Sequence, residues 1–181
     1  MKVSIFGGAN PQSGGNSYEE AFSLGNNLAR AGHVVLTGGY IGTMEAASRG
    51  AAEAGGHVIG VTCKEIEVWR GVTTNPWVME EWHYETLHER LVALIDGCDA
   101  AIALPGGVGT LLEIAMLWNR MIVDAVPRKP LILVGDGWLE LMNNFFTAQD
   151  GYVTLSSRAL ITFAHDCDEA FLLLQNHEQV K

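Results

Sequence analysis

The chain has 181 residues, with 21 acidic and 11 basic side chains, a formal net charge of -10 and 48% hydrophobic residues. This composition is typical of a folded protein and excludes a largely disordered chain. The acidic balance also excludes a surface for nucleic acid or for an anionic membrane, because both need clustered lysine and arginine. The length fits one domain over residues 1–181. Glycine is in excess, with 21 residues or about 12%, against a usual level of roughly 7%.

The hydrophobic runs and the cysteines point to a soluble, cytoplasmic protein. The apolar opening Val3–Phe6 reaches Gly7 too soon for a signal peptide, and no apolar run approaches the ~20 residues that span a bilayer. Cys63, Cys98 and Cys167 are widely spaced and odd in number. This pattern favours buried reduced thiols over a disulfide framework or a zinc ribbon.

Short apolar runs alternate with helix-length segments along the chain. The runs are continuous, as in central parallel strands that are covered on both faces. We expect strands at Val3–Phe6, Val34–Leu36, Val58–Val61, Ala100–Leu104, Leu131–Val134 and, as a sixth, Ile161–Phe163. We expect helices at Tyr18–Ala31, Met44–Ala54, Leu87–Asp96, Leu111–Val123, Trp138–Ala148 and Asp168–Asn176. This alternation predicts an α/β fold, a doubly wound (Rossmann-like) parallel sheet flanked by helices.

Three Ser/Thr-x-x-Glu patterns are typical of capping boxes at helix starts. They are Ser17 with Glu20, Thr86 with Glu89, and Thr110 with Glu113.

The segment Cys63–Trp82 has three tryptophans and no clear periodicity. A connection this long in a compact domain is often functional. It is either a lid or rim over a ligand site, or a satellite core or subunit contact.

Three glycine-rich turns follow predicted strands, at Gly7-Gly8, Gly38–Gly42 and Pro105–Thr110. In an open parallel sheet, ligands bind beyond the carboxyl ends of the strands, where these turns lie. Glycine lets the backbone approach a ligand closely, and a helix that begins after such a turn presents free amides. The turns therefore favour a phosphate site, although each glycine pair could also serve only to turn the chain.

Other nucleotide and cofactor motifs are missing. A G-x-G-x-x-G motif would need glycine at Leu112, and no lysine lies in any glycine turn for a P-loop or a pyridoxal phosphate Schiff base. His83 and His88 do not form an H-E-x-x-H motif. We expect no cofactor and no metal.

The stretch Pro105–Glu113 resembles the P-G-G-x-G-T-x-x-E motif of the LONELY GUY (LOG) family, matching all of its fixed positions. The likeness also covers Ile5–Gly8, Thr37–Met44 and Leu87–Arg90, and extends to about Leu141. LOG proteins are cytokinin riboside 5′-monophosphate phosphoribohydrolases, also described as lysine decarboxylase-like. The resemblance implies hydrolysis of a nucleoside 5′-monophosphate to free base and ribose 5-phosphate. The alternative is a non-catalytic carrier of a nucleotide or phosphorylated cofactor with the same fold.

The resemblance also assigns residues, each with a plainer alternative. Glu113 and Arg90 become catalytic, with Glu113 stabilising an oxocarbenium-like transition state. Glu113 could instead cap its helix, and Arg90 could be solvated or ion-paired. Glu45 would bind ribose hydroxyls or pair with Arg49. The expected substrate-binding residues are Gly8, Gly39, Glu45, Pro105, Gly106, Gly107, Val108, Gly109 and Thr110.

Departures from the plant-type pattern stand at Glu45, Leu91 and Leu112. They favour a changed ligand or lost activity. The helix Leu111–Val123 is apolar on nearly every face, so it is either fully buried or packed at a homodimer interface. The resemblance implies the homodimer.

Overall fold

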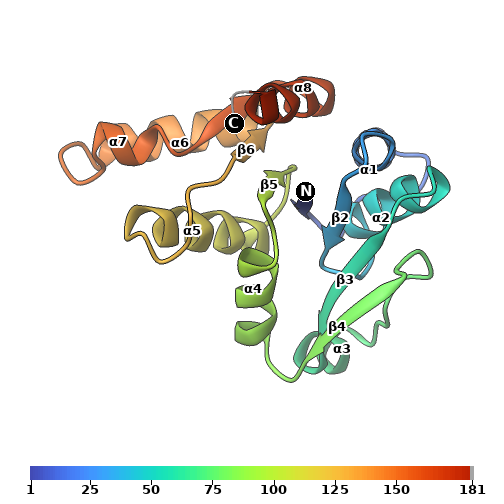
Figure 1. Cartoon of the computed structure of the whole chain (residues 1–181). Helices are drawn as coiled ribbons and strands as arrows, with labels where there is room; N and C mark the ends of the chain where they lie inside the picture. Colours follow the sequence, from blue (N-terminus) through green and yellow to red (C-terminus); the bar gives the residue numbers. More distant parts are fainter. Residues whose placement is uncertain (180–181) are drawn as a thin grey trace.

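The computed structural model describes residues 1–179 and contains one parallel sheet of seven strands in the order β4-β3-β2-β1-β5-β6-β7 (Figure 1). The strands are β1 (Lys2–Phe6), β2 (Val34–Thr37), β3 (Val58–Cys63), β4 (Glu80–Tyr84), β5 (Ala100–Ala103), β6 (Leu131–Val134) and β7 (Thr162–Ala164). The helices are α1 (Asn16–Arg30), α2 (Thr43–Glu53), α3 (Lys64–Arg70), α4 (Leu87–Asp96), α5 (Val108–Ile122), α6 (Asp136–Ala148), α7 (Leu155–Arg158) and α8 (Cys167–Gln179).

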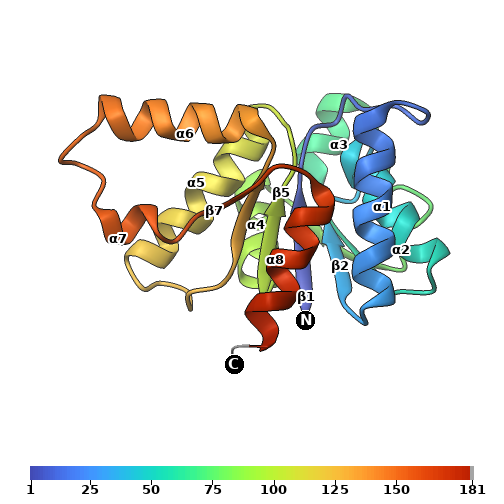
Figure 2. The same ribbon diagram turned by 90° about the horizontal axis from the view of Figure 1, so that it is seen from above.

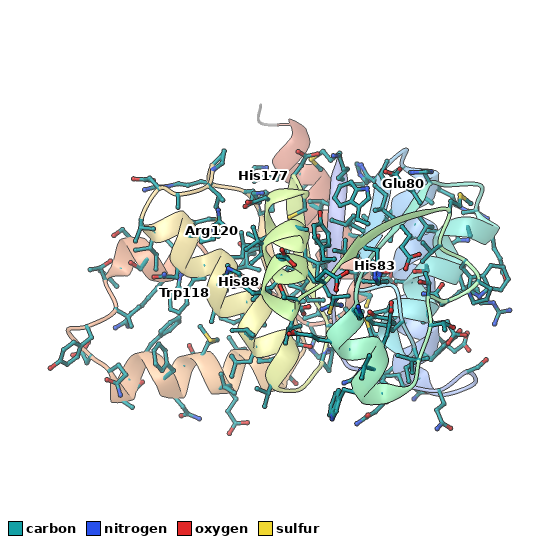
Figure 3. The ribbon with its side chains drawn as sticks, turned by 90° about the horizontal axis from the view of Figure 1, so that it is seen from below. Glu80, His83, His88, Trp118, Arg120 and His177 are labelled. Carbon is teal, nitrogen blue, oxygen red and sulfur yellow. The ribbon has the colours of Figure 1, made fainter. Side chains whose placement is uncertain are left out.

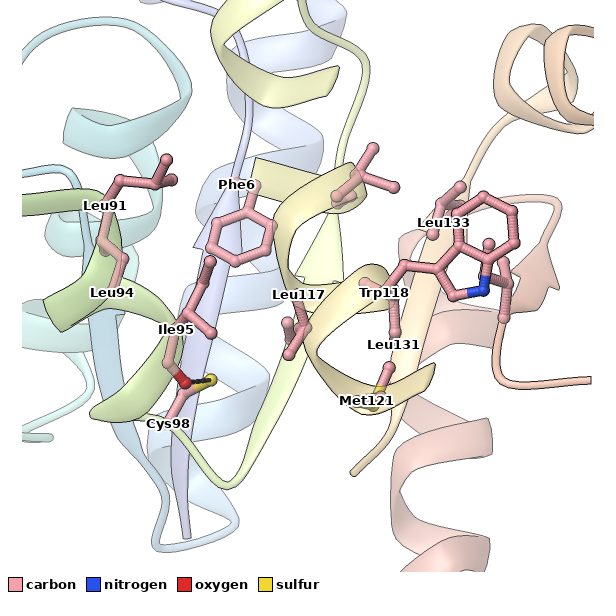
Figure 4. Packing of buried hydrophobic residues seen from close by; sticks show 14 of the residues in the cluster. Phe6, Leu91, Leu94, Ile95, Cys98, Leu117, Trp118, Met121, Leu131 and Leu133 are labelled. Atoms are coloured by element: carbon pink, nitrogen blue, oxygen red, sulfur yellow. Dashed lines mark hydrogen bonds between the residues drawn. The ribbon is translucent and has the colours of Figure 1, made fainter. Parts of the chain in front are cut away.

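Two hydrophobic cores, one on each face of the sheet, hold these elements together. Helices α1, α2 and α8 pack on one face, and α4, α5 and α6 pack on the other (Figure 2). In the second core Phe6, Ile95 and Leu117 meet between the sheet, α4 and α5 (Figure 4). The predicted α/β fold with a Rossmann-like parallel sheet is therefore confirmed.

The six expected strands are confirmed, but the sequence missed β4 at the sheet edge. Its residues, Glu-Glu-Trp-His-Tyr, are exposed or half-buried, so the strand lacks the continuous apolar pattern of its neighbours. Helix α3, in the same unassigned segment, buries no side chain and also lacks an apolar stripe.

One of the three predicted capping boxes is present. Thr86 and Glu89 cap α4 reciprocally through side chain and backbone. The other two predictions are wrong, because α1 begins after Gly15 and α5 begins after Gly107, in both cases without a side-chain cap. Glycine residues at these positions let each helix begin earlier than its Ser/Thr pattern predicts.

Helix α5 is not fully buried within the chain, which contradicts one of the two readings of its apolar sequence. Residues Ile114, Leu117 and Met121 face the core. An opposite stripe is exposed: Val108, Leu111, Leu112, Ala115 and Ile122. The three cysteines are free and buried, as expected. Among the described residues, none of the helices has the length and apolar character needed to cross a membrane.

Candidate functional site

A cavity of about 650 Å³ opens at the carboxyl edge of the sheet. It lies at the loops after β1 and β5, two adjacent strands whose chains continue into helices on opposite faces. Such a switch point is where open parallel sheets bind ligands, and the volume suits a small organic molecule.

Backbone hydrogen bonds join the three glycine turns around this switch point. The Gly8 amide donates to the Pro105 carbonyl oxygen (3.1 Å), and the Thr43 amide donates to the Gly8 carbonyl oxygen (3.0 Å). Gly8 lines the cavity as expected, but both of its backbone polar groups are engaged. It therefore shapes the wall and offers no free amide to a phosphate.

The start of α5 forms the anion-accepting wall. Gly107, Val108, Gly109 and Thr110 all line the cavity, as predicted. The first amides of an α-helix have no partner within the helix, and they carry the positive end of its dipole. The first backbone hydrogen bond of α5 is donated by the Leu111 amide to the Gly107 carbonyl oxygen. This wall is therefore suited to bind a phosphate.

Arg90 reaches the cavity from α4 and is 6% exposed. Its Nε donates to the Val61 carbonyl oxygen (2.8 Å) and its Nη2 to the Gly38 carbonyl oxygen (3.2 Å). The guanidinium also lies over the ring of Tyr40, 5.6 Å from its centroid. Arg90 is thus held in one orientation by a carbonyl of β3 and one of the turn after β2, and the reading of it as a solvated side chain is wrong.

Gly38 makes this orientation of Arg90 accessible. A Cβ atom added at residue 38 would lie 2.1 Å from Arg90 Nη2, closer than any real contact. The second glycine turn therefore admits the guanidinium, a role that sequence reasoning did not assign to it.

Glu113 projects from the second turn of α5 toward Arg90. Its Oε1 lies 3.9 Å from Arg90 Nη1, and its side chain is 13% exposed. Burial raises the pKa of the Glu113 carboxyl from 4.5 to about 7, and the Arg90 charge acts in the opposite direction. A carboxyl with this pKa can give or take a proton near neutral pH. The capping alternative for Glu113 is wrong, since α5 begins at Val108.

Tyr40 is a cavity residue that the sequence analysis did not single out. Its hydroxyl donates to the Cys63 carbonyl oxygen (3.0 Å) and accepts from the Cys63 amide (2.8 Å). Burial raises the pKa of Tyr40 to about 12, so the ring stays neutral beneath Arg90. The motif Gly-Gly-Tyr contained the residue, but only the fold shows that it supports the arginine.

Four predicted binding residues are not among those that line the cavity: Gly39, Glu45, Pro105 and Gly106. Glu45 accepts a hydrogen bond from the Tyr18 hydroxyl (3.3 Å), while Arg49 pairs with Glu53 at 2.8 Å. Gly39 accepts from the Asn75 amide, and Pro105 accepts from Gly8. These residues support the turns, and the ribose-binding role expected for Glu45 finds no support in its position.

The opposite rim is formed by α3. Glu65, Ile66, Trp69 and Arg70 line the cavity, and Trp69 is 75% exposed. The rim alternative for the unassigned segment is therefore confirmed for α3. The Trp82 ring, in contrast, packs against the core, which is the other alternative. Between rim and helix start, the cavity is apolar, with Met44, Leu87, Leu91 and Leu112.

Comparisons with known proteins show the family of this chain. Residues 44–174 match the family model described as "Possible lysine decarboxylase". The rice cytokinin riboside 5′-monophosphate phosphoribohydrolase LOG is 33% identical over 89% of this chain and 67% of its own length. LOG7 from Arabidopsis thaliana is 29% identical over 98% of this chain and 82% of its own.

Solved structures show the same architecture. The molybdenum cofactor binding protein from Rippkaea orientalis superposes with a TM-score of 0.75 at 25% identity, covering 97% of this chain and 95% of its own. The molybdenum cofactor carrier protein from Chlamydomonas reinhardtii gives a TM-score of 0.72 at 24% identity, covering 97% and 96%. At 24% identity, the similarity to the Chlamydomonas reinhardtii protein shows only that the fold is shared. On the family match and the rice relative, the chain belongs to the "Possible lysine decarboxylase" family, which agrees with the resemblance of its glycine turns to LOG proteins.

Proposed function

We propose that the protein hydrolyses the N-ribosidic bond of a nucleoside 5′-monophosphate. Water adds its hydroxyl to C1′ of the ribose, the bond to the base breaks, and the base leaves with a proton, which gives free base and ribose 5-phosphate. The observation that carries the proposal is the Glu113–Arg90 pair at 3.9 Å, nearly buried in a cavity beside the free amides of α5. The 33% identical rice phosphoribohydrolase supports the same reaction class.

Each part of the nucleotide has a matching wall. The phosphate binds the α5 amides at Gly107–Thr110, where the helix dipole compensates for a chain of net charge -10. The base lies against the apolar wall that includes Leu87, Leu91 and Leu112. The substrate is then an uncharged purine base on a ribose 5-phosphate, of adenine or cytokinin type.

Glu113 acts at the ribose between these walls. In its ionised form it stabilises the positive charge that develops at C1′ and takes a proton from the attacking water. Arg90 fixes the position of the carboxylate and keeps part of it ionised near neutral pH, because the positive charge opposes the effect of burial on the Glu113 pKa. Turnover therefore requires that both side chains keep this orientation.

A carrier function is the second candidate, favoured by the likeness to the molybdenum cofactor binding protein over 97% of this chain. The same cavity would hold a nucleotide or phosphorylated cofactor without cleaving it. The two functions are separated by incubating the protein with AMP and cytokinin riboside monophosphates, with free base followed by chromatography and binding by calorimetry. Base release supports the hydrolase, whereas tight binding without release supports the carrier and contradicts the hydrolase.

We also propose that the chain forms a homodimer through α5. The supporting observation is the exposed apolar stripe of this helix, on which Val108 is 85% and Leu112 46% exposed. A stripe of this kind is typical of an interaction surface. Light scattering at micromolar concentration should give twice the chain mass, and Ala115→Glu in the centre of the stripe should give the monomer. Asn144→Glu on exposed α6 is the control. A monomeric wild type would contradict the proposal.

A further inference from the structure

Three side chains with metal-binding atoms converge outside the cavity, between α3 and the edge strand β4. Glu67 comes from α3, and Glu81 and His83 come from β4. Residues two apart on a strand point to the same side, so Glu81 and His83 share one face. One ligand atom from each of the three residues lies within 4.8 Å of the others. In Figure 3, His83 lies where β4 passes α3.

The spacing of these atoms suits a shared cation. His83 Nδ1 lies 3.5 Å from Glu67 Oε1. In a tetrahedral zinc site with bonds of about 2.0–2.1 Å, two neighbouring ligand atoms are separated by about 3.3 Å. Thr62 holds the β4 side of the cluster in place, because its hydroxyl lies 2.7 Å from Glu81 Oε1 and 3.0 Å from His83 Nδ1. Little movement is therefore needed to bring the three atoms around one ion.

The charge of the cluster also favours a bound cation. Glu67 and Glu81 place two carboxylates within 4.8 Å, and the third member is an imidazole. Two carboxylates at this separation repel each other, and a divalent cation between them turns the repulsion into attraction. The cluster is also open to a cation in solution, since Glu81 and His83 are exposed.

We propose that Glu67, Glu81 and His83 bind a divalent transition-metal ion of the zinc type. One imidazole nitrogen and two carboxylate oxygens are ligands that zinc accepts, with water in the fourth position. This departs from the absence of metal expected from the sequence. Glu67 and His83 are sixteen positions apart and come from separate elements. No local sequence motif therefore pointed to this site.

The consequence for the molecule lies at the cavity rim. Helix α3 buries no side chain, yet it supplies Ile66 and Trp69 to the cavity. A metal held by Glu67 would tie this helix to β4 at a position between the rim residues Ile66 and Trp69. The ion would therefore stabilise the rim without contacting a ligand in the cavity. The metal site itself stands on its own geometry and does not depend on the proposed hydrolase reaction.

The test is calorimetric titration of the full chain, stripped of metal, with zinc chloride in a buffer that does not chelate. We expect one strong site per chain, weakened about tenfold or more in His83→Ala and in Glu81→Gln, as expected when a ligand is removed. The matched control is His57→Ala, which removes another exposed histidine that pairs with a β4 carboxylate, that of Glu80 at 2.8 Å. This control should bind zinc as the wild type does.

Cobalt substitution gives an independent readout. Co²⁺ should give visible absorption bands typical of four-coordinate cobalt in the wild type and in His57→Ala, and these bands should be lost in His83→Ala. Circular dichroism confirms that each variant is folded, and Glu67→Gln replaces any variant that is not. The proposal is overturned if the wild type binds no zinc, or if His57→Ala lowers the affinity as much as His83→Ala.

Discussion

The two sides of the cavity differ in how firmly their side chains are held. On the α4–α5 side, Arg90 is 6% exposed and donates to two backbone carbonyls, and Glu113 faces it at 3.9 Å. On the α3 side, Trp69 is 75% exposed and its helix buries no side chain. Catalytic groups must be held within a fraction of an ångström. We therefore propose that the chemistry takes place on the α4–α5 side, which also carries the walls for the phosphate and the base, and that the exposed α3 rim adds only further contacts to the bound ligand.

Among changes that leave both catalytic side chains in place, the largest effect is expected from disturbing the firmly held side. Gly38→Ala places a Cβ 2.1 Å from Arg90 Nη2, so the guanidinium must shift from the position in which it faces Glu113. Base release should fall about a hundredfold, since a misplacement of about 1 Å costs this much. Gly137→Ala is the matched control, because a Cβ there meets nothing within 4 Å. Equal rates in both variants would show that the Arg90 position does not matter.

A second effect follows from the raised pKa of Glu113. The folded protein holds this proton up to about pH 7, whereas a free glutamate releases it near 4.5. The stabilisation by the neutral form is therefore present at low pH and is lost as the pH rises through about 7. Over this range the loss is about 3 kcal/mol for this one group.

Urea denaturation at pH 5 and pH 8 measures that loss. Glu113→Gln keeps the side chain neutral at both pH values, so its unfolding free energy should fall less than that of the wild type between them. Parallel changes in the two proteins would mean that the Glu113 carboxyl titrates near its ordinary pKa.

The smallest effect is expected at the exposed rim. Trp69→Ala removes an exposed indole that lines the cavity and whose ring contacts only Arg70, another rim residue, and neither Arg90 nor Glu113. The KM for the nucleotide should rise a few-fold while kcat stays within about twofold, because lost uniform binding raises KM alone. Steady-state kinetics decides this. A fall in kcat as large as that of Gly38→Ala would show that the rim matters for the chemistry as much as the firmly held side does.

The sequence predicted more of the firmly held side of the cavity than of its rim. The glycine turns, Glu113 and Arg90 were singled out because the short stretches Thr37–Met44, Leu87–Arg90 and Pro105–Glu113 resemble motifs of one family. The burial of Arg90 could not be predicted, since it depends on Gly38 and Tyr40 from a distant turn.

The helix and the strand of the rim segment were missed because polar edge elements show no hydrophobic periodicity. Helix α3 and strand β4 both lack a continuous buried face, so periodicity does not distinguish them from a loop. Glu45 was assigned to the ligand because it follows a glycine turn, yet it does not line the cavity and its carboxylate accepts a hydrogen bond from Tyr18. The single domain over residues 1–181 and the cytoplasmic location stay predictions.

The most direct measurement is base release from a nucleoside 5′-monophosphate by the wild type and by Glu113→Gln, with Glu140→Gln, an exposed glutamate of α6, as the matched control. General-base removal typically costs a factor of about 10²–10⁴. We predict release by the wild type and by Glu140→Gln, and a loss of this size in Glu113→Gln with nucleotide binding retained. Release by Glu113→Gln at the wild-type rate would contradict the assignment of the chemistry to the Glu113–Arg90 pair.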